Sequence, residues 1–129
     1  MVRSLLSVLT CIAVLPFASC RRAAEQGSGL VIQSEILPRP PRVGPATIML
    51  ALSDSSTKPV TGASVSIEGD MTHAGMAPVF YGSKEVRPGR YRSDIAFSMP
   101  GDWIVLLHVT LADGTKAERQ IDVPGVAAN

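Results

Sequence analysis

The stretch "DWIVLLHVTL", residues 102–111, decides the fold, because it is the most apolar segment of the chain after the N-terminal region. In a strand, every second side chain points to the same face. One face of this stretch consists of Trp103, Val105, Leu107 and Val109, and the other carries Ile104, Leu106 and His108. Both faces are largely apolar, which is typical of a strand that is covered on both sides. We therefore expect residues 102–111 to form a central strand of a sheet.

The segments on either side of this stretch alternate in the same way. Residues 90–97 place Tyr91, Ile95 and Phe97 on an inward face, and Arg90, Arg92 and Asp94 on an outward face. After the central stretch, "ADG" is a hairpin turn signal, and residues 115–123 again alternate between apolar and charged side chains. The pattern predicts two further strands, each with one buried face.

The rest of the mature chain is punctuated by Pro and Gly at short intervals, with no amphipathic helix of useful length. The segments between these breaks predict strands at about residues 29–37, 45–53, 63–69 and 78–86. Together with the three strands above, they predict one domain over residues 29–125. Its expected fold is all-β, an immunoglobulin-like β-sandwich of about seven antiparallel strands.

The first 19 residues have the three-part pattern of a secretory signal: a basic Arg3, an apolar run and then small residues. The ending "FASC" resembles a bacterial lipobox, although that pattern prefers Leu where this chain has Phe17. We expect cleavage before Cys20, a lipid on its sulfur, and a polar tether over residues 20–28. The alternative is a plain signal peptide that is cut near the same place without lipidation.

These features predict an exported protein, held as a lipoprotein at the periplasmic face of a membrane. Arg21 follows the cysteine, which favours the outer membrane if the host has two membranes. Cys11 leaves with the signal and Cys20 is acylated, so the mature domain has no free thiol and no disulfide. Any soft metal ligand must then be a methionine or a histidine.

The segment "EGDMTHAGMAPV", residues 68–79, supplies such ligands within six residues: Met71, His73 and Met76. Thioether sulfur and imidazole together suit Cu(I) and disfavour hard ions. If the strand continues through this segment, Met71 and His73 point to the same face, and the small residues after His73 let the chain turn Met76 back toward them. Met99 and His108 are candidates to complete or replace a ligand.

Each of these residues also has an ordinary structural interpretation. Methionine is a common filler of gaps in cores, so Met71 or Met76 could simply pack beneath the loop and Met99 could close the base of a turn. His73 could be an exposed loop residue, and His108 a satisfied histidine on a sheet. The pattern Met-x-His-x-x-Met is weak by itself, and the two interpretations stay open at this point.

Composition and motifs argue against two other classes of function. The net charge is +1, so the chain has no electrostatic footprint for nucleic acid. It carries no G-x-S-x-G or H-E-x-x-H motif, and its glycines lie in turns rather than in a phosphate-binding loop. Glu68 and Asp70 are two apart, which more often means two solvated charges than a catalytic pair. We expect no enzymatic activity.

Three short motifs follow one another in an informative order: "KPVTGA" at residues 58–63, "PGRY" at 88–91 and "MPGDW" at 99–103. With the Met–His–Met segment between the first two, this order resembles the YtkA-like domain, which is related to the FixH-like proteins. The resemblance covers about residues 29–123.

The resemblance implies an exported or membrane-anchored immunoglobulin-like sandwich. It also implies a link to copper handling and to the assembly of copper-containing respiratory oxidases. The expected partner is then an envelope copper protein or an oxidase assembly factor, with the lipid as the contact to the membrane. The alternative is a non-catalytic envelope binding or structural module without metal, with Arg90, Arg92 and Asp94 as its contact surface.

Overall fold

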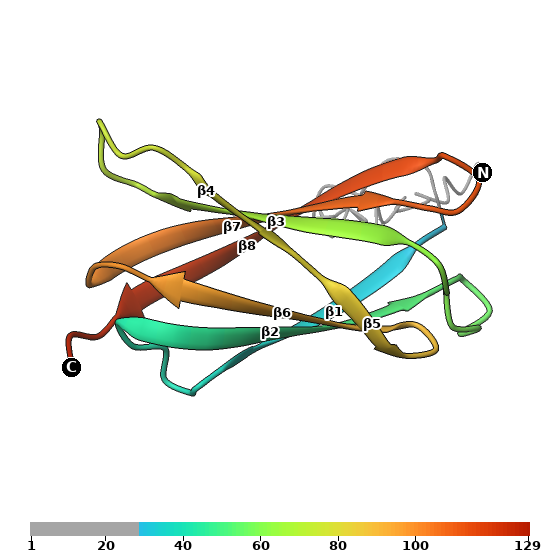
Figure 1. The fold of residues 1–129 in the computed structure, drawn as a ribbon, viewed down its shortest axis with the longest axis horizontal. Helices are drawn as coiled ribbons and strands as arrows, with labels where there is room; N and C mark the ends of the chain where they lie inside the picture. The colour runs from blue at the N-terminus through green and yellow to red at the C-terminus, as the bar shows by residue number, and fades with distance from the viewer. Residues whose placement is uncertain (1–28) are drawn as a thin grey trace, which may run out of the picture.

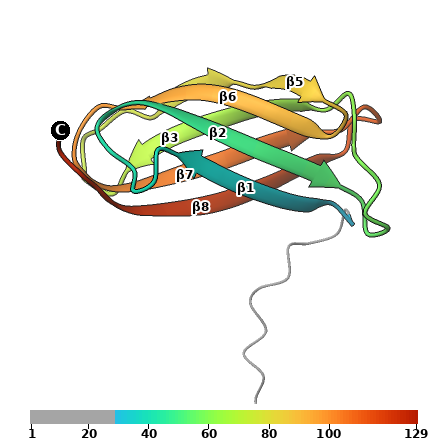
Figure 2. The ribbon, with the colours of Figure 1, turned by 90° about the horizontal axis from the view of Figure 1, so that it is seen from below.

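The computed structural model describes residues 29–129, which form eight strands in two four-stranded antiparallel sheets (Figure 1). The first sheet has the strand order β1-β2-β6-β5 and the second has the order β4-β3-β7-β8. The two sheets lie face to face, as Figure 2 shows from a second direction. The strands are β1 Val31–Leu37, β2 Gly44–Ser53, β3 Ser64–Met71, β4 Val79–Gly82, β5 Lys84–Arg87, β6 Arg90–Phe97, β7 Gly101–Thr110 and β8 Lys116–Val126.

This strand order confirms the predicted immunoglobulin-like sandwich. In that fold the first, second, fifth and fourth strands share one sheet, and the third, sixth and seventh share the other. Here β1, β2, β6 and β5 occupy the first set of positions, and β3, β7 and β8 occupy the second. The additional strand β4 lies at the edge of the second sheet, beside β3.

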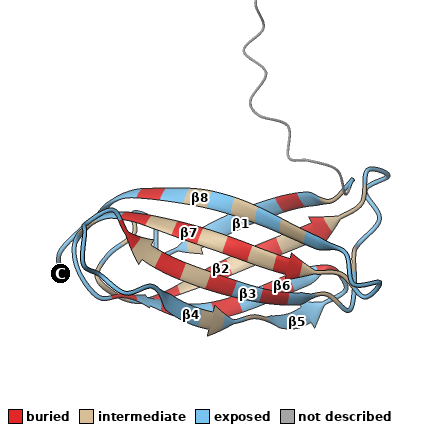
Figure 3. Cartoon of the chain, turned by 90° about the horizontal axis from the view of Figure 1, so that it is seen from above, coloured by how far each residue is buried: buried red, intermediate tan, exposed pale blue. Residues whose placement is uncertain are grey.

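The core lies between the sheets and follows the predicted alternation. Buried residues alternate with exposed ones along β6, and with half-buried ones along β7 (Figure 3). As expected, β7 is central, paired with β3 on one side and with β8 on the other. The ring of Trp103 packs edge-on against Phe97 from the opposite sheet, with ring centroids 5.3 Å apart. The most deeply buried side chains are Tyr91, Phe97, Ile48, Leu50, Leu52, Ile67, Leu107, Val105, Val109 and Ser93.

The single strand predicted at residues 78–86 is wrong, because this segment changes sheets. Its first half, β4, pairs with β3, and its second half, β5, pairs with β6 in the other sheet. The link is held at Gly82 and Ser83: the amide of Ser83 donates to the carbonyl of Val65 at 3.0 Å, and the hydroxyl of Ser93 donates to the carbonyl of Gly82 at 2.9 Å. Residues 29–129 therefore form eight strands, one of them created by this crossing.

The end of the sandwich at which the described chain begins is called the proximal pole here. It is closed by Glu85 and Tyr91: the Glu85 carboxylate accepts hydrogen bonds from the amides of Gly62 and Gly89, each at 3.0 Å. These amides hold the pKa of the Glu85 carboxyl below its usual range. The Tyr91 hydroxyl joins the two sheets at this pole, donating to the carbonyl of Val60 at 3.0 Å and accepting from the amide of Ala63 at 3.1 Å.

Gly89 is required at this pole for reasons of space as well as conformation. Its φ is +69°, and a Cβ there would lie 2.8 Å from the carbonyl oxygen of Leu52 and 2.8 Å from the Cβ of Pro59. The "KPVTGA" and "PGRY" motifs are therefore packed directly against each other. They form one structural unit at this pole.

The opposite end is called the loop pole. It consists of the connections between strands at residues 38–43, 72–78 and 98–100, the ends of the strands that they join, and the C-terminal residues 127–129. The amide of Val43 donates to the carbonyl of Ala127 at 2.8 Å, which ties two of these segments together. In Figure 1 the connection from β3 to β4 and the C-terminus lie at this same end.

All buried residues of the described chain lie between Ile32 and Val126. A chain that begins at residue 21 therefore contains this entire core and is expected to fold by itself. The predicted signal at residues 1–19, the lipid at Cys20 and the tether at 20–28 lie outside the described residues. Within the described part, no helix is long and apolar enough to cross a membrane.

Candidate metal centre

The loop pole holds four of the five candidate ligands. Met71 ends β3, His73 and Met76 belong to the connection from β3 to β4, and Met99 lies in the connection from β6 to β7. Segments about 25 residues apart in the sequence thus meet at one end of the sandwich, because β3 and β7 are paired neighbours. The fifth candidate, His108, lies elsewhere.

Met71 is the inner residue of this group. The third strand was predicted to end at residue 69, but β3 continues to Met71, which pairs with Trp103 of β7. Met71 is only 5% exposed and belongs to the core. Its thioether therefore lies at the margin of the core, beside the indole of the only tryptophan in the chain.

His73 approaches Met71 across a glycine of the neighbouring strand. Gly101, the first residue of β7, has a φ of +125°, and a Cβ there would lie 3.5 Å from the Cε of Met71 and 3.9 Å from the Cε1 of His73. Both side chains thus border the same bare stretch of backbone. The absence of a side chain at Gly101 leaves them room to approach each other.

Met71 and His73 were expected to share a strand face only if the strand continued through this segment, and this condition is not met. The strand ends at Met71, so His73 lies in a bend and not in a strand. Contacts with β7 place both side chains near Gly101 instead. The amide and the hydroxyl of Thr72 both reach the carbonyl of Asp102, at 3.3 Å and 3.4 Å, and so hold the start of the loop against β7.

Met99 lies two residues before Gly101, in the connection from β6 to β7. Its carbonyl accepts a hydrogen bond from the indole nitrogen of Trp103 at 3.0 Å, which fixes the backbone of the turn before β7. The Met99 side chain is 39% exposed and that of Met76 is 37% exposed. Two solvent-accessible thioethers therefore belong to the same pole as the buried thioether of Met71.

His108 is separate from this group. It lies on the outer face of the β7 sheet, where its Nε2 is 2.8 Å from a Glu68 oxygen and its Nδ1 is 2.8 Å from a Glu118 oxygen. It is five residues from Trp103 along β7, which is about 16 Å in a strand. The hydrogen bond with Glu68, followed by that with Glu118, raises the pKa of the imidazole, against the opposing effect of partial burial. The structure does not bring His108 to the loop pole.

The donor atoms at the loop pole indicate which kind of metal ion could bind there. Thioether and imidazole are neutral and soft to borderline donors, a set that suits Cu(I) better than hard divalent ions. Within residues 29–129, no group of three or more His, Cys, Asp and Glu side chains could hold a metal ion. Thioether and imidazole are the donor types that a soft monovalent ion prefers.

Sequence reasoning identified the methionines and His73 but missed Gly101. The "MPGDW" motif contains this glycine, and its position after Pro100 predicts only a turn. Its role depends on the register of β3 against β7, which places Met71 opposite Trp103. A two-residue shift of that register would move Met71 away from Gly101.

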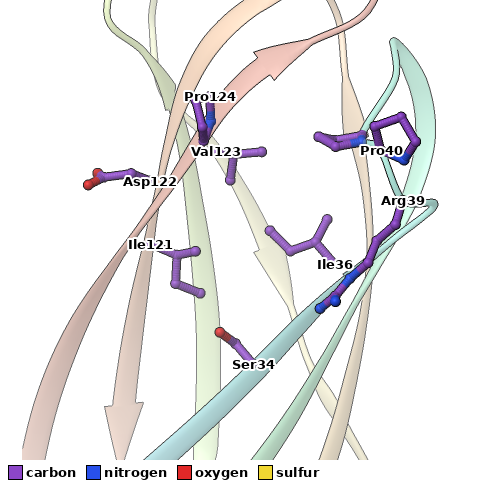
Figure 4. Close-up of a pocket in the computed structure, with 9 residues that line it drawn as sticks. Ser34, Ile36, Arg39, Pro40, Ile121, Asp122, Val123 and Pro124 are labelled. Atoms are coloured by element: carbon purple, nitrogen blue, oxygen red, sulfur yellow. The ribbon is translucent and has the colours of Figure 1, made fainter.

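A hollow lies between the edge strands β1 and β8. It has a volume of about 430 Å³, and Ile36, Ile121 and Val123 project into it (Figure 4). Arg39 and the prolines 40, 41 and 124 form its rim. Residues 39–41 of this rim belong to the loop pole, but the lining contains no thioether and no imidazole, so the hollow does not add a soft metal ligand.

Comparison with known proteins gives one family and one solved structure. A family model described as YtkA-like matches residues 31–108, a range that includes β1, most of β7 and the loop from β3 to β4. No curated protein matches the chain. The crystal structure of the PmoD soluble domain from Methylocystis sp. ATCC 49242 (Rockwell) is similar at 11% sequence identity, with 76% of this chain and 90% of that chain covered and a TM-score of 0.49.

Proposed function

The chain belongs to the YtkA-like family, and on this premise we propose that it is an exported β-sandwich that binds copper as Cu(I). The proposed ligands are Met71, His73 and Met76, with Met99 as the accessible thioether that can replace one of them. The observation that carries the proposal is the approach of Met71 and His73 to the same side of Gly101. Neutral sulfur and nitrogen donors stabilise Cu(I) without any net negative charge.

The exposure of the outer donors suits a protein that passes copper on. A partner can reach Met76 and Met99 from solvent, so ligands can be exchanged one at a time while Met71 keeps hold of the ion. We propose delivery to an envelope copper protein, or to a factor that assembles a respiratory oxidase. In this role copper is the cargo of the protein and takes part in no reaction there.

The test is a titration of the domain that starts at residue 21 with Cu(I), in competition with a coloured Cu(I) chelator. The variant combines Met71→Leu, His73→Gln and Met76→Leu, which keeps the volume of each side chain but removes the donors. We expect the wild type to compete for one Cu(I) and the triple variant to lose at least tenfold in affinity. Quenching of Trp103 fluorescence gives a second readout, because Trp103 pairs with Met71.

The matched control replaces a methionine and a histidine that lie outside the loop pole, by Met49→Leu and His108→Gln. Met49 is a half-buried residue of β2, and His108 is on the outer face of β7. This control should bind Cu(I) as the wild type does. Equal affinity in the triple variant and the wild type would remove the site from the loop pole.

The proposed location is the periplasmic face of a membrane, with a lipid on Cys20 as the anchor. Labelling of cells with a palmitate analogue should mark the wild type and leave Cys20→Ala unmarked. The absence of label from both proteins would instead indicate a protein released after signal cleavage. This experiment is independent of copper binding.

A second candidate function is an envelope binding module that carries no metal. The observation that favours it is the outward position of Arg90, Arg92 and Asp94 on β6, as the sequence predicts. A domain that binds no Cu(I) in the titration above but retains a partner through this face would have this function.

A further inference from the structure

The outer face of β5 and β6 is strongly basic. Tyr91 and Ser93 of β6 are buried, so Arg90 and Arg92 point outward, and paired residues on β5 point the same way. Arg90 pairs with Arg87, and Arg92 pairs with Lys84. These four residues, Lys84, Arg87, Arg90 and Arg92, are called the basic face.

The pairing on this face places like charges directly opposite each other twice. Like charges in cross-strand pairs destabilise a sheet. Among the described residues, only one of the four cations of the basic face forms an ion pair that offsets this repulsion. Arg92 is 2.9 Å from Asp94, whereas no ion pair is recorded for Arg87 or Arg90 in this part of the chain. Because this repulsion destabilises the free protein, a bound anion that offsets it is expected to stabilise the protein.

The basic face also has an apolar floor. Arg87, Arg90 and Arg92 surround a hollow of about 440 Å³ with Met49 and Val86 in its lining. Val86 is 50% exposed, because the irregular register of β5 displaces it between the paired positions of Glu85 and Arg87. Cations around exposed apolar side chains match the boundary between lipid headgroups and acyl chains.

The outer face of the opposite sheet carries the reverse charge. Glu68 and Asp70 of β3 pair with Leu106 and Ile104, the outward residues of β7. On the other side of β7, Glu118 and Asp122 of β8 point outward as well. These four carboxylates, Glu68, Asp70, Glu118 and Asp122, are called the acidic face. They lie on the opposite side of the sandwich from the basic face, although Asp94 lies on the basic side and Lys116 on the acidic side.

We propose that the basic face binds the surface of an anionic phospholipid bilayer, with headgroup phosphates between the arginines and with Met49 and Val86 against the headgroup boundary. The acidic face then points away from the membrane, and the difference in charge between the two faces determines which of them contacts the bilayer. The 28 residues that precede Gly29 carry the predicted anchor, which would keep the domain near a bilayer. The inference does not depend on copper binding.

This orientation lays the strands parallel to the membrane instead of upright. The loop pole then lies beside the bilayer, at the height of the headgroups, rather than at the top of an upright domain. Met76 and Met99 would face a partner that is itself embedded in the membrane. The basic face therefore determines which partners can reach the loop pole.

The test is co-sedimentation of the domain that starts at residue 21, which lacks the predicted anchor, with vesicles. Vesicles of phosphatidylcholine that contain phosphatidylglycerol should bind the wild type, and vesicles of phosphatidylcholine alone should not. The double variant Arg87→Glu with Arg90→Glu should bind at least tenfold more weakly, because each basic residue near an anionic surface contributes about a factor of five. Binding should fall as salt shortens the Debye length.

The matched control is Lys58→Glu with Lys116→Glu, which changes the net charge by the same amount. Lys58 lies in a turn of the proximal pole, and Lys116 begins β8 on the acidic side. This control should keep most of the binding. Equal loss in both double variants would mean that net charge alone acts, and would overturn the assignment to the basic face.

Orientation can be measured directly, because a domain that starts at residue 21 has no cysteine. Gln33→Cys places a fluorophore on the outer face of the sheet that holds the basic face, and Gln120→Cys places one on the acidic face. Quencher lipids should quench the first strongly and the second weakly. Equal quenching, or association of the domain with itself in place of vesicle binding, would overturn the proposal.

Discussion

At the scale of the residue, Gly101 has the greatest influence on the candidate site. It combines a positive φ with a position at which a Cβ would contact both Met71 and His73. The sequence identifies the donors by their chemistry, since methionine and histidine are recognisable in any context. It does not identify Gly101, because the importance of this glycine arises only when β3 and β7 are aligned.

Gly101→Ala is expected to lower both stability and Cu(I) affinity. The positive φ costs about 1–3 kcal/mol for a residue with a side chain, and the new methyl group would occupy space beside Met71 and His73, in van der Waals contact with both. Urea unfolding measures the first effect and the competition titration measures the second. Gly114→Ala is the control, because Gly114 has a φ of +88° but no atom within 4 Å of its Cβ position. A loss of Cu(I) affinity in both variants would show that strain alone is responsible.

At the scale of the element, the strands with one clear apolar face were predictable and the crossing between sheets was not. Alternation shows which side of β6 or β7 is buried. It says nothing about which sheet a strand joins, so residues 78–86 look like one continuous strand. The change of sheet depends on hydrogen bonds from Ser83 and Ser93 to residues that are distant in sequence.

The two serines at this crossing should respond in opposite ways to removal of their hydroxyls. The hydroxyl of Ser83 is buried, with no hydrogen-bond partner among the described protein atoms, so Ser83→Ala should leave stability unchanged or raise it by up to about 1 kcal/mol. The hydroxyl of Ser93 bonds to Gly82, so Ser93→Ala should lower stability by about 1 kcal/mol. Urea unfolding of both variants checks this, and a loss of stability from Ser83→Ala would indicate an unseen partner such as water.

His108 links three neighbouring strands, and the strength of this link depends on pH. It lies between Glu68 of β3 and Glu118 of β8, and both raise its pKa. A raised pKa in the folded state means that protonation favours folding. The stabilisation is therefore complete below about pH 6.5, the usual value for histidine, and is lost as the pH rises through the raised pKa.

His108→Gln should accordingly be less stable than the wild type at mildly acidic pH and should approach it at alkaline pH. The difference is expected to stay below about 1 kcal/mol, because solvent reaches this ion pair. Urea unfolding over a series of pH values measures it. His73→Gln, which removes an imidazole from the exposed loop, is the control. A difference that does not change with pH would mean that His108 acts only by packing.

At the scale of the whole molecule, stability depends on the core between the sheets. The cysteines of the sequence are Cys11 and Cys20, both outside residues 29–129, so no disulfide supports the sandwich. The sequence predicted this dependence, together with the fold class and most of the core. It could not predict the segregation of charge onto opposite faces, because that requires the order of strands within each sheet.

Leu107→Ala should test how much the core contributes. Leu107 is fully buried on the inward face of β7, and its truncation should cost about 2–5 kcal/mol. That is a large part of the stability of an ordinary domain. The neighbouring Leu106 is half-buried on the outward face, so Leu106→Ala should lower the free energy of unfolding clearly less than Leu107→Ala does. Similar losses in urea unfolding would contradict the inward and outward assignment of β7.

The placement of the two poles has a mechanical consequence. The described chain begins beside the first residue of β1, and the loop pole lies at the other end of the strands. A pull between an anchor on the N-terminal side and a partner at the loop pole would run along the strands. The seven residue pairs between β1 and β2 would then bear the force at the same time, in shear. They would not separate one after another. The domain is thus built to bear tension in the direction in which a tethered protein would be stretched.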